Sequence, residues 1–200
     1  MTIAVSTRCF EPGTLGWSAD DFADAEFRRL WAEGHYEIVD GVLTIMPAAY
    51  FPSGAGLFNL LYLLKSHLKE HRLPGSFSVE VDLVLRKDRI VRSDAVMLTP
   101  DDERRQQAAS RRPGKFRAAQ APILIAPTLV IESVSPDHGD HDRVTKRAWY
   151  AESGIPNYWI LDAWKRSLNC LRLDGSKYRV DQAGRGKAKL QPALFPELLR

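Results

Sequence analysis

The chain is poor in cysteine and has no long apolar run. Its 200 residues include only Cys9 and Cys170, which are too far apart in sequence to form a metal knuckle or a disulfide framework. We therefore expect a reducing compartment. No apolar run approaches the roughly 20 residues that a membrane-spanning helix needs, and residues 1–17 lack the basic start and apolar centre of a signal peptide. These absences predict a cytoplasmic protein that has no membrane partner.

The motifs of several enzyme and metal-binding classes are also missing. We find no glycine loop that would cradle a phosphate and no nucleophile elbow. His138 and His141 lie among three aspartates in the stretch PDHGDHD, but their spacing is poor for zinc and no second cluster matches them. The stretch also lacks the pattern of glycine and final glutamate that defines an EF-hand. We interpret it as the capped start of a helix.

The composition fits a single domain over residues 1–200, with residues 1–17 as an N-terminal extension. Hydrophobic residues make up 44% of the chain and charged residues 26%, without a long polar tract. A chain of this length and composition can bury a sizeable core. The net charge of +3 is a weak indication of an anionic partner.

Positive charge gathers in residues 100–122, which we predict to be a basic insertion loop between two strands. From position 104 to position 120 the segment contains no acidic residue. Two interpretations are open, because such a segment is either a solvated loop or a nucleic-acid-binding segment whose cations grip phosphates. The candidate nucleic-acid-binding residues are Arg104, Arg105, Arg111, Arg112, Lys115 and Arg117.

Hydrophobic periodicity predicts a mixed sheet flanked by helices, which is an α/β (α+β) fold. Leucines recur at helical spacing over residues 56–71, whereas apolar and polar residues alternate over residues 76–85. The pairs Asp40-Gly41 and Asp174-Gly175 predict an N-terminal and a C-terminal β-hairpin. The core order is helix, three strands, helix and strand (αβββαβ). These core elements are predicted over residues 56–71, 76–85, 90–98, 128–134, 142–153 and 157–162.

Two carboxylates occupy unusual places in this pattern. Glu132 lies inside the apolar run from Leu129 to Val134, where an unpaired charge would cost several kcal/mol to bury. Asp94 lies 38 positions earlier, where the second core strand becomes fully apolar. Neighbouring strands can bring the two carboxylates side by side, and a cation such as Mg²⁺ or Mn²⁺ would then offset the burial cost. A carboxylate pair with a water-activating metal ion is a minimal apparatus for phosphodiester hydrolysis.

A lysine and a third carboxylate complete the set of candidates. Lys146 shares a helix face with Trp149 and Tyr150, the side that large aromatic residues bury. There it would orient or deprotonate a water molecule, or neutralise charge on the cleaved phosphate. Alternatively, its stem covers the aromatic residues while its ammonium group reaches solvent. Glu37 lies in the first hairpin, where the alternation of residues allows either face.

Five stretches together resemble the Uma2 family of endonuclease-like proteins. They are YEIVDGVLTIMP, VRSDAVML, PTLVIESVSP, DRVTKRAWYAESGIPNYWILD and LQPALFPELL, and they follow the family's order and spacing over about residues 18–200. That family is similar to the PD-(D/E)xK restriction-endonuclease-like superfamily. The resemblance implies a restriction-endonuclease-like fold with the αβββαβ core, and a magnesium-dependent nuclease activity.

The resemblance also implies roles for individual residues. Asp94 matches the aspartate of the PD half-motif and Glu132 the acidic residue of the (D/E)xK half, which are both metal ligands in the superfamily. Position 134 is a valine rather than the motif's lysine, and Lys146 matches the lysine that this family carries on the following helix. Glu37 matches the family's glutamate in the first hairpin, where a supporting metal or water contact is implied.

Three departures accompany the resemblance. Ser93 stands where a proline usually precedes the aspartate, a small change in a turn. Many relatives have a histidine before the first core helix, and the stretch AAYFPSGAGLF has none. The segment 104–117 is also longer than in many relatives.

The resulting expectation is a bacterial endonuclease that cuts DNA with metal-activated water. Its catalytic residues would be Asp94, Glu132, Lys146 and Glu37, with Asp94 and Glu132 as ligands of Mg²⁺ or Mn²⁺. The alternative is a catalytically weak or inactive protein of the same fold that only binds nucleic acid or another protein, for which Trp164 and Phe51 are candidate anchors. A symmetric homodimer would suit a cut of both strands.

Overall fold

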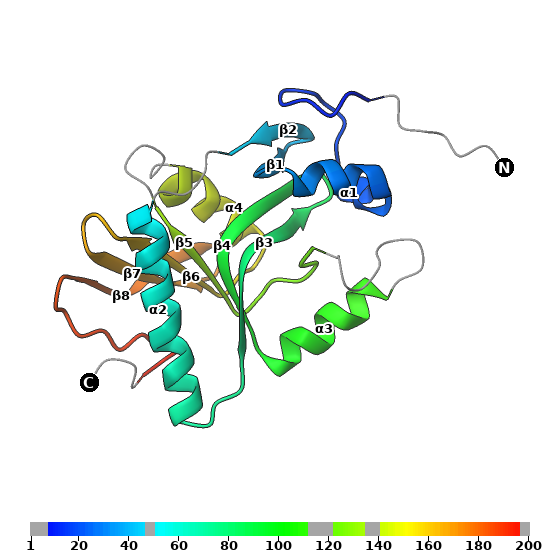
Figure 1. Cartoon of the computed structure of the whole chain (residues 1–200). Helices are drawn as coiled ribbons and strands as arrows, with labels where there is room; N and C mark the ends of the chain where they lie inside the picture. The colour runs from blue at the N-terminus through cyan, green and yellow to red at the C-terminus, as the bar shows by residue number, and fades with distance from the viewer. Residues whose placement is uncertain (1–7, 47–50, 112–121, 135–140, 197–200) are drawn as a thin grey trace.

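The computed structural model describes residues 8–46, 51–111, 122–134 and 141–196, and a mixed sheet runs through them (Figure 1). The strand order is β2-β1-β4-β5-β6-β7-β8, and β3 pairs with β4 outside this path. β5 and β6 are parallel, and the other described strand pairs are antiparallel. The predicted mixed α/β fold is therefore confirmed.

The elements follow the predicted order with one addition, α3. The strands are β1 (Tyr36–Val39), β2 (Val42–Ile45), β3 (Ser76–Arg86), β4 (Arg89–Leu98), β5 (Leu129–Ser133), β6 (Asn157–Asp162), β7 (Ser167–Asp174) and β8 (Lys177–Arg185). The helices are α1 (Ala25–Ala32), α2 (Phe51–Glu70), α3 (Pro100–Ser110) and α4 (Arg147–Glu152), with a 3-10 helix at Ala19–Ala23 and a π-helical turn at His141–Lys146. In the described ranges no helix is long and apolar enough to cross a membrane.

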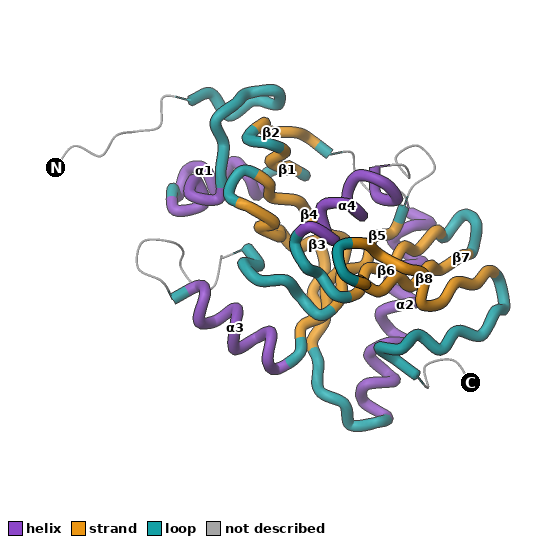
Figure 2. The backbone as a smooth tube through the Cα atoms, turned by 180° about the vertical axis from the view of Figure 1, so that it is seen from behind, coloured by secondary structure: helices purple, strands orange, loops and turns teal. Residues whose placement is uncertain are grey.

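Helices α2 and α4 cover opposite faces of the sheet. In Figure 1 α2 lies in front of the strands, and in the reverse view of Figure 2 α4 lies in front. The predicted leucine stripe of α2 packs on Ile131 and Trp159, whereas Tyr150 of α4 packs on Val130 and Tyr158. Because successive residues of a strand point to opposite faces, Glu132 lies on the same face of β5 as Val130, under α4.

An aromatic cluster fastens the N-terminal part of the chain to the first hairpin. Trp17, Phe22, Phe27 and Trp31 are buried together with Ile38 of β1 and other apolar residues. Of the extension predicted over residues 1–17, residues 8–17 are described, and their last residue belongs to this core.

Both predicted hairpins are present. Asp40 and Gly41 have positive φ values of 52° and 81°, as a two-residue turn between β1 and β2 requires. In the second hairpin Asp174 pairs with Lys177, so the turn residues are Gly175 and Ser176, one position later than predicted.

The segment predicted as a basic insertion loop over residues 100–122 begins instead as a helix. Thr99 caps α3 in a capping box with Asp102, and Pro100 occupies the first turn, where its missing N–H costs nothing. These start signals lie just before the basic residues, which is why attention to the basic run alone missed the helix. Residues 112–121 lie outside the described part of the chain.

Candidate active site

Asp94 of β4 and Glu132 of β5 lie side by side on the sheet face under α4. Ala95 pairs with Ile131, and continuing this antiparallel register by one residue sets Asp94 opposite Glu132. Residues directly opposite in such a pair have Cβ atoms about 4.5–5.5 Å apart. The backbone N–H of Ser133 donates to Asp94 Oδ2 at 2.6 Å, which holds this carboxylate against β5. The fold thus brings the two carboxylates together, while their role as metal ligands stays a prediction.

Lys146 is buried among acceptors and does not reach solvent, so the interpretation of a lysine with an exposed ammonium group is wrong. Its side chain is 5% exposed. Nζ lies 3.1 Å from Glu37 Oε1 and 3.2 Å from Glu132 Oε1, and it donates to the carbonyl oxygen of Arg92 at 3.1 Å. The three donors of the ammonium group therefore have three acceptors.

Glu37 completes the link between the first hairpin and the sheet. Besides the ion pair with Lys146, its Oε1 accepts from the backbone N–H of Arg92 at 3.2 Å. The side chain of Arg92 is held in turn by Asp82 and by the carbonyl oxygen of Gly34. The alternation that left the face of Glu37 open in the sequence is resolved, because its side chain points into the cluster.

Tyr150 of α4 supports the second carboxylate. Its hydroxyl donates to Glu132 Oε1 at 2.5 Å, so this oxygen receives two hydrogen bonds, one from Tyr150 and one from Lys146. Burial and the charge of Glu132 raise the pKa of Tyr150 well above its ordinary value, which keeps the hydroxyl a donor. The predicted helix face of Lys146 and Tyr150 is thus directed at Glu132.

Two further side chains of the cluster, His141 and Asp142, were assigned to helix capping and so missed. Both belong to the π-helical turn that runs directly into α4, a backbone form frequent at functional sites. His141 Nε2 lies 3.8 Å from Glu37 Oε2, and neither atom has a hydrogen-bond partner within the described ranges. Asp142 Oδ1 lies 3.8 Å from Lys146 Nζ. The four-residue spacing of Asp142 and Lys146 was the available signal.

The cluster places one buried lysine among four carboxylates, and this imbalance sets their protonation. Burial and the charge of Glu132 raise the pKa of Asp94 well above its ordinary value. The same two causes raise the pKa of Asp142 to about 7. Burial also pushes the pKa of Glu37 upward, but Lys146 outweighs it and holds that pKa below its usual range. Burial opposes the charged form of Lys146, yet the carboxylates raise its pKa, so the ammonium group stays protonated.

The donor set fits a magnesium ion. In the described part of the chain, no three Asp, Glu, His or Cys side chains are placed to hold a metal together. Mg²⁺ usually takes only one or two protein carboxylates and keeps several water ligands, and Asp94 and Glu132 supply such a pair. The repulsion that raises the pKa of Asp94 is also the energy that a bound cation would relieve.

The strand beside Asp94 is distorted. Val79 pairs with Ala95 and Val81 with Ser93, but Glu80, which the register sets opposite Asp94, has a φ of 50° and does not pair. The left-handed region costs a residue with a Cβ about 1–2 kcal/mol. Strain of this kind tends to gather at functional sites.

Removing the charge of Asp142 should flatten the pH dependence of stability. Because its folded pKa of about 7 lies above the unfolded value near 4, folding becomes less favourable as the pH rises between these values. In Asp142→Asn this loss disappears. We expect urea midpoints in EDTA to fall less from pH 5 to pH 8 in the variant than in the wild type. An equal fall in both proteins would contradict the assignment of this carboxylate.

The candidate nucleic-acid-binding residues of α3 are largely neutralised by neighbouring acids. Arg104 pairs with Asp101 at 2.9 Å, and Arg105 pairs with both Asp101 and Asp102. Arg111 ends the helix and is exposed. The other three candidates, Arg112, Lys115 and Arg117, lie outside the described residues.

Comparisons with known proteins give a family and a fold. The model of the Uma2 family, described as "Putative restriction endonuclease", matches residues 24–199. A crystal structure of a protein from Anabaena variabilis ATCC 29413, described as a "putative nuclease belonging to DUF820", matches with a TM-score of 0.61. The two chains are 17% identical, and the match covers 84% of this chain and 86% of the other. No curated protein matches the chain.

Proposed function

Because the chain belongs to the Uma2 family of restriction-endonuclease-like proteins, we propose that it is a metal-dependent endonuclease that hydrolyses phosphodiester bonds of DNA. The observation that carries the proposal is the buried contact of Lys146 with Glu37 and Glu132, next to Asp94. A cluster of this composition is costly to bury. If these positions served only to pack the core, apolar residues of similar volume would suffice.

Each residue has a distinct part in the proposed reaction. Asp94 and Glu132 hold the divalent cation, and bound Mg²⁺ or Mn²⁺ supplies a water of lowered pKa and charge compensation for the phosphate. Lys146 neutralises the charge that develops on the phosphate oxygens, and its ion pair with Glu132 holds that carboxylate in place. Glu37 positions Lys146 from the opposite side, and its unpartnered Oε2 offers an acceptor for a water molecule.

Plasmid nicking tests this proposal. Supercoiled DNA is incubated with the purified chain in Mg²⁺, in Mn²⁺ and in EDTA, and the open-circular form is measured over time. We expect nicking in either metal and none in EDTA. Cleavage that persists in EDTA would refute metal dependence, and intact plasmid in both metals would favour the alternative of a binding module without catalysis.

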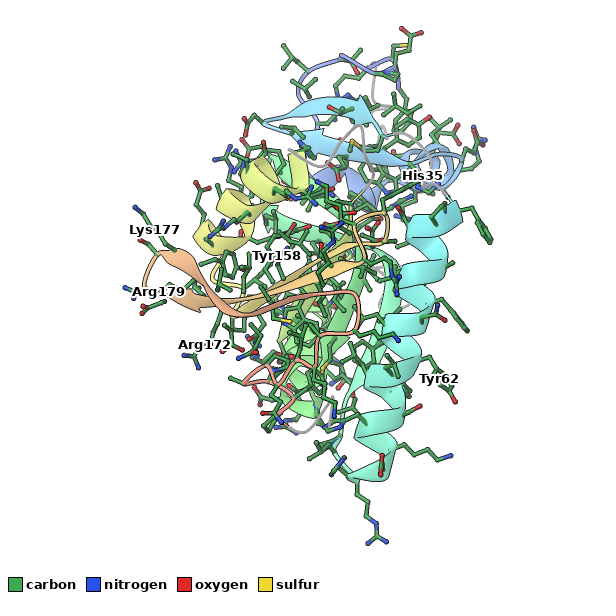
Figure 3. All side chains as sticks on the ribbon, turned by 90° about the vertical axis from the view of Figure 1, so that its left-hand side faces the viewer. His35, Tyr62, Tyr158, Arg172, Lys177 and Arg179 are labelled. Carbon is green, nitrogen blue, oxygen red and sulfur yellow. The ribbon has the colours of Figure 1, made fainter. Side chains whose placement is uncertain are left out.

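We propose that the chain forms a homodimer and that the contact uses the outward face of α2. Phe51, Phe58 and Tyr62 are 87%, 70% and 65% exposed, and they follow one another at helical spacing. Figure 3 shows Tyr62 directed away from the sheet. Apolar patches of this kind mark contact surfaces, and a two-fold contact uses the same patch on both copies.

Phe58→Glu should therefore shift the chain toward the monomer. Light scattering after size exclusion measures the mass of both proteins. Val180→Glu is the control, because Val180 is an exposed apolar residue of β8 and lies outside this helix. A wild-type chain that is monomeric at high concentration would refute the dimer.

A further inference from the structure

Positive charge is concentrated in the C-terminal hairpin rather than in α3. Residues 163–189 contain eight Lys and Arg but only two Asp and no Glu, so their net charge is +6. The whole chain has a net charge of +3, and the remainder is therefore net negative. The segment comprises the turn after β6, strands β7 and β8, and the residues that follow. Local concentration of positive charge is the electrostatic footprint of nucleic-acid binding.

One group of these cations lies at the end of the sheet that carries the carboxylates. Glu132 pairs with Ile160, and the turn between β6 and β7, residues 163–166, begins three positions later. Strand spacings put this turn within about 15 Å of Glu132. The N–H of Gly186 donates to the carbonyl oxygen of Arg166 at 2.7 Å, which joins the end of β8 to the turn. The turn and the end of β8 therefore form one surface.

The side chains on this surface are exposed, and Arg185 is held in place because its Nε donates to the carbonyl oxygen of Lys165 at 2.9 Å. Trp164 is 53% exposed, and the charged side chains around it are exposed as well. Lys165 has a loose contact of 3.7 Å with Asp162, whereas the other cations form no ion pair with a described residue. We call this surface the turn patch, and it consists of Trp164, Lys165, Arg166, Arg185 and Lys187.

We propose that the turn patch binds the sugar-phosphate backbone of a nucleic-acid strand beside the carboxylate cluster, with Trp164 stacking on an unpaired base. The inference deepens the proposed nuclease function and rests on it, because it names the surface that would hold the substrate. Cations without acidic partners suit phosphates, and an exposed aromatic ring among them suits the flat face of a base. The carboxylate cluster carries negative charge and repels the phosphates of a nucleic acid. A positively charged surface beside it would offset this repulsion.

The same hairpin offers a matched control at its other end. Arg172 and Lys177 are exposed and unpaired among the described residues, and Figure 3 labels both. Lys177 is at the tip of the hairpin, and Arg172 lies two residues before the end of β7. β7 has eight residues, which separates the tip from the turn patch by about 25 Å. Reversing two charges at either end changes the net charge of the protein equally.

The test measures the anisotropy of fluorescent 20-nucleotide single strands and duplexes in EDTA, where cleavage is absent. Arg166→Glu/Lys187→Glu should weaken binding at least tenfold and reduce the slope of log affinity against log salt by about two contacts. Arg172→Glu/Lys177→Glu should change affinity less than threefold. Trp164→Ala should weaken single-strand binding about tenfold while the salt slope is kept.

Three results would overturn the inference. They are equal losses in the two double variants, unchanged binding in the turn-patch variant, and no oligonucleotide binding by the wild type, the last of which would point to a protein partner. The failure of this inference and the failure of the proposed function are distinguishable, because binding is measured in EDTA and nicking in Mg²⁺ or Mn²⁺. If the wild type binds through the turn patch but never nicks plasmid, the nuclease proposal fails and the nucleic-acid surface stands.

Discussion

Replacing Lys146 with methionine is expected to abolish plasmid nicking, with a loss of at least about 100-fold, and to destabilise the fold. Methionine keeps most of the volume but removes the ammonium group that contacts Glu37, Glu132 and the carbonyl oxygen of Arg92. Leaving buried charges without their partner costs about 3–5 kcal/mol in comparable cases. The loss of activity follows from removing a fixed positive charge at the phosphate.

The pH dependence of this destabilisation gives a second readout. In the wild type Lys146 holds the pKa of Glu37 below its usual range, so this pair stabilises the fold above about pH 4.5 and the benefit is lost as the pH falls through the folded pKa. Without the lysine, burial raises the pKa of Glu37 instead. The difference in unfolding free energy between wild type and variant should therefore be largest near pH 7.5 and shrink toward pH 4.

Lys65→Met is the control for this experiment. Lys65 is exposed on α2, so its replacement should change stability by less than about 0.5 kcal/mol and leave nicking unchanged. Urea unfolding followed by circular dichroism measures both variants, and nicking is assayed where each is folded. A Lys146→Met protein as stable and as active as the wild type would refute the proposed centre.

The sequence predicts the frame of the site well because its signals are local or periodic. Hydrophobicity along the chain predicts the strand that holds Glu132 and the strand that becomes fully apolar after Asp94. The order of the strands then makes Asp94 and Glu132 neighbours. Helical spacing puts Lys146 on the face of Tyr150, even though the turn before α4 is π-helical, but it leaves open whether the ammonium group reaches solvent. Each of these inferences needs only the period of the element.

The parts that were missed depend on contacts between distant segments or between neighbouring charges. His141 comes to face Glu37 only because the first hairpin packs beside β4, a contact of residues more than 100 positions apart. Arg104 and Arg105, the first two cations of the basic run, pair with Asp101 and Asp102, which lie just before them in the sequence. The cations of the C-terminal hairpin are spread over 25 positions and become one surface only when the end of β8 meets the turn after β6.

The second large effect is expected for Asp94→Asn, which should lose nicking by at least about 100-fold and yet become more stable in EDTA. Asparagine keeps the shape and an oxygen that can accept from Ser133 N–H, but it removes one of two facing negative charges. Burial and Glu132 raise the pKa of Asp94, so its ionisation disfavours folding as the pH rises above the unfolded value near 4. At pH 8 the thermal midpoint of the variant should rise by about 2–4 °C, the shift that corresponds to roughly 1 kcal/mol in a chain of this size.

The response to Mg²⁺ shows whether Asp94→Asn is more stable and less active because a metal ligand is lost or because of a general effect of the substitution. In the wild type added Mg²⁺ should raise the thermal midpoint, since a ligand that binds only the folded state stabilises it, and Asp94→Asn should show little or no rise. Asp174→Asn, at the tip of the C-terminal hairpin, is the control with an exposed carboxylate, and it should keep both nicking and the response to Mg²⁺. A stabilised Asp94→Asn that still nicks plasmid would show that the charge is costly without serving catalysis. If the thermal midpoint of the wild type does not respond to Mg²⁺, then Asp94 and Glu132 do not hold this ion. The proposed role of the two carboxylates as magnesium ligands would then be wrong.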